Sequence, residues 1–146
     1  MKFSEFYKRF PDESTCVLIL KEIKEREGII CKKCSNDAYY WKNDKKSFEC
    51  KKCKYRMSLK RGTIMENSNL PLKYWMSSIV FFKIMKEEIS ALALQRAIGH
   101  KRYEPIWLMV KRIKNMTDAD FLISKISDYI AIERNSIYLK NRFEIR

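Results

Sequence analysis

The chain has no long apolar run, and this lack limits where the protein can act. A membrane-spanning helix needs about 20 consecutive apolar residues, and no window of the 146 residues approaches that length. The first five residues reach charged side chains at once, so they do not form the apolar segment of a secretory signal. We therefore expect a soluble, intracellular protein with no membrane partner.

Acidic residues are scarce beside basic ones. The sequence holds 18 Asp plus Glu against 31 Lys plus Arg, which gives a net charge of +13. An excess of this size indicates a polyanionic partner, and nucleic acid is the usual one. Much of the excess falls between residues 42 and 61, where nine basic side chains accompany two acidic ones. An alternative explanation for this segment is that its lysines keep a metal-binding region soluble and offset the charge of thiolates.

Histidine occurs once, whereas cysteine occurs five times. Four cysteines form two Cys-x-x-Cys pairs, Cys31 with Cys34 and Cys50 with Cys53, with fifteen residues between the pairs. Each pair can wrap one side of a tetrahedral ion, so this spacing predicts a closed structural Zn²⁺ site. Two disulfides would require an oxidising compartment, and a redox pair would stand beside a βαβ pattern, which the sequence lacks. We expect Cys16 to be a small buried apolar residue.

Short apolar or aromatic runs flank both cysteine pairs. They comprise residues 29–30, 38–41, 47–48 and 55–57. Because such runs favour strands, residues 29–60 are predicted to form a zinc ribbon in which each pair stands at the tip of a short hairpin.

Two helices are predicted before the ribbon, in residues 1–28. Apolar residues recur at helical spacing from Phe3 to Phe10, and Pro11 ends that pattern. Asp12 can cap a second helix, and Gly28 suits its end. We expect both helices to pack on the ribbon, because the ribbon is too small to bury a core alone. The apolar side of the second helix is expected to comprise Val17, Leu18, Leu20 and Ile23.

Residues 68–117 show the pattern of a helix-turn-helix bundle. Residues 72–86 are apolar nearly all round, which predicts a central helix. A helix from Ile89 to Ile98 is expected to end at Gly99, and another to run from about Glu104 to Met116. Two short helices joined by a glycine-containing turn, after a supporting helix, follow the order of a helix-turn-helix. The residues expected to face inwards are Leu92, Ala93 and Ala97 in the first helix and Ile106, Met109, Val110 and Ile113 in the second.

Candidate DNA contacts follow from the positions of charge. In a helix-turn-helix, residues at the start of the second helix meet base edges, and basic residues in the turn and along the helix meet phosphates. We interpret His100 as a polar turn residue beside phosphate or solvent, not as a zinc ligand. Trp75 and Trp107 are both expected in the core. The candidate contacts with double-stranded DNA are Lys51, Lys52, Lys54, Lys60, Arg61, His100, Lys101, Arg102, Tyr103, Lys111, Arg112 and Lys114.

Several stretches occur in a fixed order along residues 3–117: Phe10-Pro11 with Cys16, Gly28 to Cys34, Phe48 to Cys53, Arg61 to Ile64, Leu70 to Trp75, Ile89 to Arg96 and Gly99 to Trp107. This order resembles the N-terminal region of bacterial zinc-ribbon insertion-sequence transposases of the ISXO type. The resemblance implies that ribbon and helix-turn-helix jointly recognise the ends of a mobile element. It also implies a bacterial cytoplasmic protein associated with the nucleoid.

In that family a DDE catalytic domain follows, an RNase H-like fold whose acidic residues hold divalent metal ions. After Thr117 only twenty-nine residues remain, whereas an independent catalytic domain needs about 100 or more. Residues 130–134 resemble the first catalytic strand, but Arg134 interrupts its acidic pattern. The later acidic residues needed to complete a catalytic triad with Glu133 are not present. Two-metal chemistry needs several converging carboxylates. We therefore expect a protein that is not an enzyme.

The last segment, residues 118–146, carries enough apolar residues for an ordered tail. A hairpin of residues 129–133 and 137–139 and a helix over residues 120–131 both fit its pattern. Because an isolated hairpin is marginally stable, the tail should pack on the helices or pair with a second copy. A homodimer through this tail is thus a hypothesis. We interpret Asp118, Asp120 and Asp128 as helix-end or surface acids.

The fold class expected from these patterns is α+β and mainly helical, with a small zinc ribbon inserted between N-terminal helices and a helix-turn-helix bundle. The function expected is that of a non-catalytic, zinc-dependent DNA-binding protein that recognises mobile-element ends or acts as a regulator. One alternative is a truncated transposase fragment that needs a partner chain for catalysis. Another is an adaptor whose ribbon binds other proteins.

Overall fold

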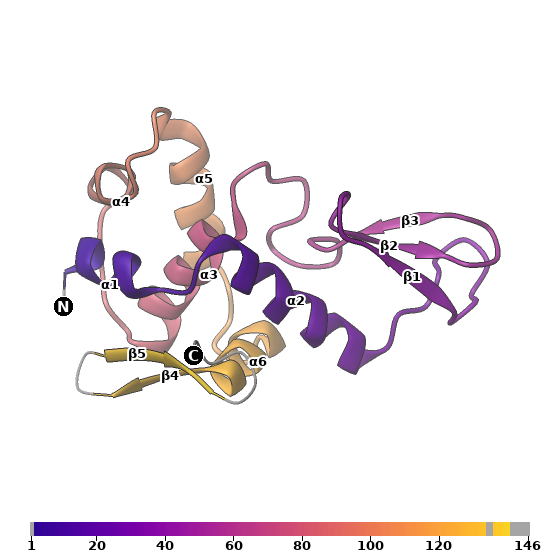
Figure 1. The fold of residues 1–146 in the computed structure, drawn as a ribbon. Helices are drawn as coiled ribbons and strands as arrows, with labels where there is room; N and C mark the ends of the chain where they lie inside the picture. Colours follow the sequence, from indigo (N-terminus) through magenta and orange to yellow (C-terminus); the bar gives the residue numbers. More distant parts are fainter. Residues whose placement is uncertain (1, 134–135, 141–146) are drawn as a thin grey trace. The chain divides into compact units, whose positions relative to one another are not determined.

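The computed structural model describes residues 2–133 and 136–140, which form an α+β fold with the elements labelled in Figure 1. The chain divides into two compact units. The cysteine unit comprises residues 17–67, and the helical unit comprises residues 1–16 and 68–146. The division falls within helix α2 (Glu13–Glu27). In the described part of the chain, no helix combines the length and the apolar character that a membrane crossing requires.

The cysteine unit is built on a three-stranded antiparallel sheet (Figure 1). Its strands, adjacent in this order, are β1 (Tyr39–Lys42), β2 (Ser47–Cys50) and β3 (Arg56–Ser58). Phe48 on β2 is buried and stands opposite Trp41 on one side and Met57 on the other. The ring centroid of Phe48 lies 5.0 Å from that of Trp41 and 5.2 Å from that of Tyr39. These cross-strand aromatic contacts supply the small sheet with an apolar core.

The part of α2 that belongs to the cysteine unit packs on this sheet, as the sequence predicts. The Tyr39 hydroxyl donates to a carboxylate oxygen of Glu25 at 3.2 Å. The ammonium group of Lys21 lies 5.5 Å from the ring centroid of Trp41, within the range of a cation–π contact. A helix thus covers side chains that three short strands could not bury alone.

Helix α2 begins and ends where its capping residues predict. Asp12 Oδ1 accepts the N–H of Thr15 at 2.9 Å, and Gly28 follows the helix with a left-handed φ of 95°. The predicted apolar side needs one correction, because Leu18 is 48% exposed whereas Ile19 is fully buried. Ile19 lies on the side of the helix whose residues are spaced by three and four positions. Leu18 lies outside that side.

The helical unit contains most of the helices. Its elements are α1 (Phe3–Arg9), α3 (Leu72–Ile79), the π-helical segment η1 (Val80–Ile84), α4 (Ala91–Ile98), α5 (Tyr103–Lys114), α6 (Phe121–Tyr129) and the antiparallel strands β4 (Ile130–Glu133) and β5 (Ser136–Leu139). The two stretches of chain that form this unit meet at Glu13. Its carboxylate oxygens accept the backbone N–H groups of Leu72 at 3.0 Å and Lys73 at 2.7 Å. A negative charge at these donors stabilises the N-terminus of α3.

Aromatic side chains of α1 pack against η1 within the helical unit, so the prediction that this helix packs on the ribbon is wrong. The ring centroids of Phe3 and Phe6 lie 5.1 and 5.5 Å from that of Phe81, and all three side chains are buried. Trp75 on α3 is also buried, as predicted, and its indole N–H donates to Ser68 Oγ at 3.0 Å. The apolar pattern of residues 72–86 thus forms the centre of this unit.

Helix α4 begins two residues later than predicted, and this shift changes which side chains face inwards. Ser90 precedes the helix, and its Oγ accepts the N–H of Ala93 at 3.1 Å. Ala91 and Leu94 are buried, whereas Leu92 is 46% exposed and Ala93 is exposed, so the prediction for these two residues is wrong. Helix α5 keeps its predicted inner face, which consists of Ile106, Met109, Val110 and Ile113.

The tail combines the two interpretations that its pattern left open. Helix α6, capped by Asp120, continues into β4, and Ile130 on β4 pairs with Leu139 on β5. Helix α6 packs on η1 and buries Ile126 and Tyr129. Much of the apolar surface that motivated the homodimer hypothesis is therefore covered by the same chain. Arg134 lies outside the described residues.

Candidate metal centre and basic surfaces

The two Cys-x-x-Cys pairs adopt matching backbone turns. In the first pair the N–H of Ser35 donates to the carbonyl of Cys31 at 2.9 Å, and in the second the N–H of Lys54 donates to the carbonyl of Cys50 at 3.0 Å. Ser35 and Lys54 are both left-handed, with φ of 63° and 65°. A single reversed turn of this kind closes each pair around one side of a common point.

Only the second cysteine pair stands on a hairpin, because Cys50 ends β2 and Cys53 lies in the turn before β3. Residues 28–38, which contain the first pair, form a turn and no strand. The prediction of two hairpins is therefore wrong for the first pair. The apolar run at Ile29 and Ile30 has no partner strand, and Ile30 is exposed.

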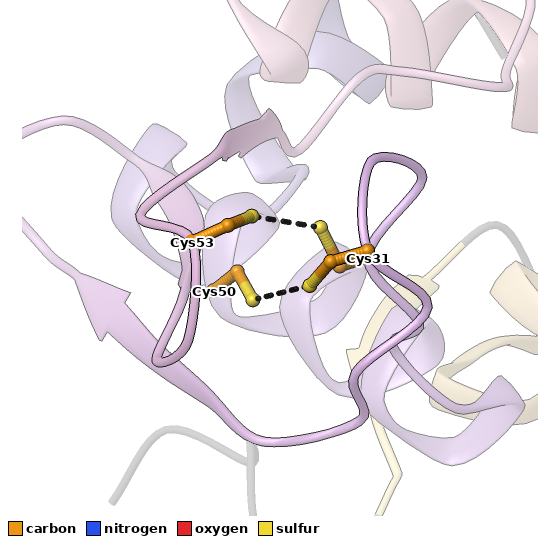
Figure 2. Close-up of side chains that lie close together, drawn as sticks. Cys31, Cys50 and Cys53 are labelled. Carbon is orange, nitrogen blue, oxygen red and sulfur yellow. Dashed lines mark hydrogen bonds between the residues drawn. The ribbon is translucent and has the colours of Figure 1, made fainter.

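The four thiols converge on one point. Figure 2 shows Cys50 and Cys53 facing Cys31 across a short gap. The Sγ atoms of Cys31 and Cys53 lie 3.5 Å apart, as do those of Cys34 and Cys50, and all four lie within 4.8 Å of one another. Zn–S bonds of about 2.3 Å place tetrahedral sulfurs about 3.8 Å apart. The observed spacing fits a four-coordinate metal.

Backbone donors favour the thiolate form of two of these cysteines. The N–H groups of Cys53 and Lys52 lower the pKa of the Cys50 thiol to about 6. At Cys31, desolvation opposes ionisation, but the N–H groups of Cys34 and Lys33 outweigh it and lower the pKa. Deprotonated sulfur is the form that binds metal.

Cys16 is a buried apolar residue, as predicted. It lies on the segment of α2 that belongs to the helical unit, and its thiol donates to the carbonyl oxygen of Pro11 at 3.6 Å. Burial raises the pKa of this thiol well above its usual range. A thiol that resists ionisation is a poor metal ligand.

Lysines of the cysteine unit gather round the exposed side chain of Tyr40. The ammonium groups of Lys51, Lys42 and Lys54 lie 4.9, 5.5 and 5.6 Å from the Tyr40 ring centroid. Two of these lysines are predicted DNA contacts, whereas Lys42 and Tyr40 were not identified from the sequence. Lys52 is also exposed. Cation–π contacts can hold three positive charges close together on this surface.

Arg61 is less available for a phosphate than its sequence position suggests. Its guanidinium donates to the hydroxyl of Tyr55 and lies 5.6 Å from the centroid of that ring. Its carbonyl oxygen accepts from Lys24 Nζ at 2.6 Å. These contacts favour a structural role for Arg61. Lys60, beside it, is half-buried.

The turn between α4 and α5 is held by side chains. Gly99 ends α4 with a left-handed φ of 81°. The side-chain amide of Gln95 donates to the carbonyl oxygens of His100 at 3.0 Å and Lys101 at 3.3 Å. His100 Nδ1 lies 3.3 Å from the hydroxyl of Tyr74 on α3. His100 is a polar turn residue, as predicted, and these contacts position the start of α5.

Helix α5 places its predicted contact residues on the surface. Lys114 lies 3.8 Å from a carboxylate oxygen of Glu88, and Lys111 lies 5.1 Å from the ring centroid of Trp107. The exposed members of the predicted set in the turn and on α5 are Lys101, Arg102, Tyr103, Lys111, Arg112 and Lys114.

Trp107 was expected in the core, but it is 43% exposed. The buried side of α5 contains Ile106 and Val110, and position 107 lies on another side of the helix. Its four-residue spacing from the charged Lys111 is the sequence signal that could have identified this exposed position.

The four cysteines are the cluster of potential metal ligands found in the described part of the chain. Glu133 lies exposed at the end of β4.

Comparison with protein-family models, curated proteins and solved structures finds no match to this chain. A functional assignment therefore rests on the chain's own residues and geometry.

Proposed function

We propose that this protein is a non-catalytic DNA-binding protein whose cysteine unit is stabilised by one structural Zn²⁺. The observation that carries the metal proposal is the convergence of four sulfurs within 4.8 Å. Four thiolates in a tetrahedral set are typical of zinc or of iron–sulfur centres. The two Cys-x-x-Cys turns and the short distances between the sulfurs favour a single ion. Four protein ligands would leave no open position for a substrate.

Zinc would supply folding energy to a unit that has little of its own. The sheet consists of three strands of three or four residues each, and units of this size often depend on a metal for stability. Cys31, Cys34, Cys50 and Cys53 would hold the ion and fix the positions of the neighbouring lysines.

The DNA-binding proposal rests on α4, α5 and the turn between them. Helix α5 buries one side on the helical unit and exposes basic residues on the other. The contacts of Gln95 and His100 fix the turn from which α5 starts. In a helix-turn-helix, the second helix lies in the major groove of DNA. Lys101 and Arg102 would then lie near base edges, and Lys111 and Arg112 near phosphates.

The lysines around Tyr40 provide a second basic surface, on the cysteine unit. Lys51, Lys52 and Lys54 would contact phosphates without reading the base sequence. The order of the cysteine pairs and helices resembles that of insertion-sequence transposases, and we propose mobile-element ends as the first class of site to test. A role in the bacterial nucleoid belongs to the same proposal.

Duplex binding by matched double variants tests this function. Sequences bound by the zinc-loaded chain are first selected from a random duplex pool, and affinities are then measured by fluorescence anisotropy. Changing Lys111 and Arg112 to Ala should weaken binding at least about tenfold, because two charge-assisted contacts are lost. Changing Lys8 and Arg9 to Ala removes the same charge from the end of α1 and should have little effect.

Three outcomes would contradict the proposal in different ways. Equal losses in the two double variants would mean that net charge, and not α5, controls binding. No duplex binding by the zinc-loaded chain would favour a protein-interaction adaptor. Cutting or joining of DNA with Mg²⁺ or Mn²⁺, abolished by Glu133→Ala, would show that the chain is catalytic.

A further inference from the structure

An apolar strip runs along the exposed side of α5. Trp107 is 43% exposed, and Tyr103 is exposed to a similar extent. Tyr103, Trp107 and Lys111 follow one another at four-residue steps, so they lie on one side of the helix. The opposite side is fully used in the core. Folding of this chain therefore gives no reason for an indole at position 107.

The surroundings of Trp107 distinguish it from an ordinary exposed apolar residue. Single exposed hydrophobic side chains are common and need no explanation. Here the ammonium of Lys111 lies 5.1 Å from the indole ring centroid. The turn and the helix carry one acid, Glu104, against five exposed basic residues. These five are Lys101, Arg102, Lys111, Arg112 and Lys114.

An apolar strip framed by positive charge suits a partner that offers both apolar groups and negative charge. A second copy of this helix would bring like charges together and would be repelled. A DNA duplex offers phosphates at the groove edges and apolar methyl groups on the groove floor. Among the bases, thymine carries that methyl group in the major groove.

We propose that Trp107 contacts the C5-methyl group of a thymine in the major groove, so that the recognised DNA carries a thymine at that position. This inference rests on the proposed function, in which α5 enters the groove. Trp107 is the fifth residue of α5, within the N-terminal part of a recognition helix that reaches base edges. The indole face has no hydrogen-bond acceptor, so it reads a methyl group better than it reads polar base edges. Lys111, one turn further along, then lies toward the phosphates.

Replacing thymine by uracil tests this contact, because uracil lacks the methyl group and pairs in the same way. A duplex selected by the full zinc-loaded chain is prepared with each thymine replaced in turn. For the wild-type chain, uracil at one position should weaken binding about fourfold, the effect of one buried methyl group. The Trp107→Ala chain should bind the thymine duplex more weakly and should no longer distinguish uracil from thymine at that position. The Trp107→Phe chain keeps an aromatic face and should still distinguish them.

Leu108→Ala is the matched control, because Leu108 is the neighbouring exposed apolar residue on α5. This variant should retain the full sensitivity to uracil. The inference is overturned if no thymine position is sensitive, or if Trp107→Ala remains as sensitive as the wild type. Duplex binding that persists in either case leaves the proposed function standing. A change of oligomeric state in Trp107→Ala, with DNA affinity unchanged, would instead identify the strip as an interface between copies.

Discussion

The carboxylate of Glu13 offers a quantitative test of how the helical unit is held together. Its two oxygens accept backbone N–H groups at the start of α3, at 3.0 and 2.7 Å. Glu13 is exposed, so each hydrogen bond contributes toward the lower end of the range for charged acceptors. Loss of a helix cap of this kind costs about 1–2 kcal/mol. For a unit of this size, a loss of about 1 kcal/mol lowers the melting temperature by about 4–8 °C.

Thermal unfolding of Glu13→Ala, followed by circular dichroism, should therefore show a melting temperature lower by about 5–10 °C. Glu13→Gln retains one acceptor oxygen and should fall between this variant and the wild type. Glu5→Ala is the control, since Glu5 is also an exposed acid in the first turn of a helix. It removes the same charge and should shift melting far less. The Glu13 effect should also persist in high salt, because short hydrogen bonds are screened less than distant charges. Equal melting temperatures for Glu13→Ala and Glu5→Ala would refute the capping role.

Two further predictions concern the core of α4 and the metal centre. Leu94→Ala should destabilise the helical unit by about 2–5 kcal/mol in urea unfolding, because Leu94 is fully buried. Leu92→Ala should change stability little. Similar losses of stability in the two variants would mean that α4 is rotated relative to the structure. Cys31→Ser should lose stoichiometric zinc, measured by elemental analysis of the purified protein, and should unfold the cysteine unit. Cys16→Ser should keep its zinc, and loss of zinc from both variants would show that the ligand set is misassigned.

Local signals in the sequence were sufficient to predict where most helices begin and end. Pro11, Asp12 and Gly99 act on the backbone within a few residues, so their effect does not depend on the rest of the fold. The cysteine spacing is informative for the same reason. One short turn closes each pair, and sulfurs of the two pairs then lie 3.5 Å apart.

Side-chain orientation on the helices was harder to predict. Leu92 and Leu18 are apolar residues next to truly buried ones, and a shift of one position moves a side chain by about 100° around a helix. Trp107 was also predicted to be buried and is exposed. Our explanation for its exposure is a contact with a partner, and the sequence of this chain does not contain that partner. Glu13 and Leu72, at the start of α3, are 59 positions apart in the sequence, and a contact of that separation leaves no local pattern.

The tail shows how two patterns can both be partly right. Residues 121–129 have helical spacing and form α6, whereas residues 130–133 alternate and pair as a strand. The change of period occurs within one apolar segment, so length alone did not separate the alternatives. Helix α6 packs on η1, and the chain becomes extended from Ile130 onward.

The salt dependence of duplex binding by the zinc-loaded chain tests the central claim most directly. If α5 and the lysines near Tyr40 contact about six phosphates, the logarithm of the association constant should fall linearly with the logarithm of salt concentration. Affinity should then drop about a thousandfold between about 50 and 200 mM salt. An affinity that is negligible at low salt, or one that does not change over this range, would contradict DNA binding through these basic surfaces.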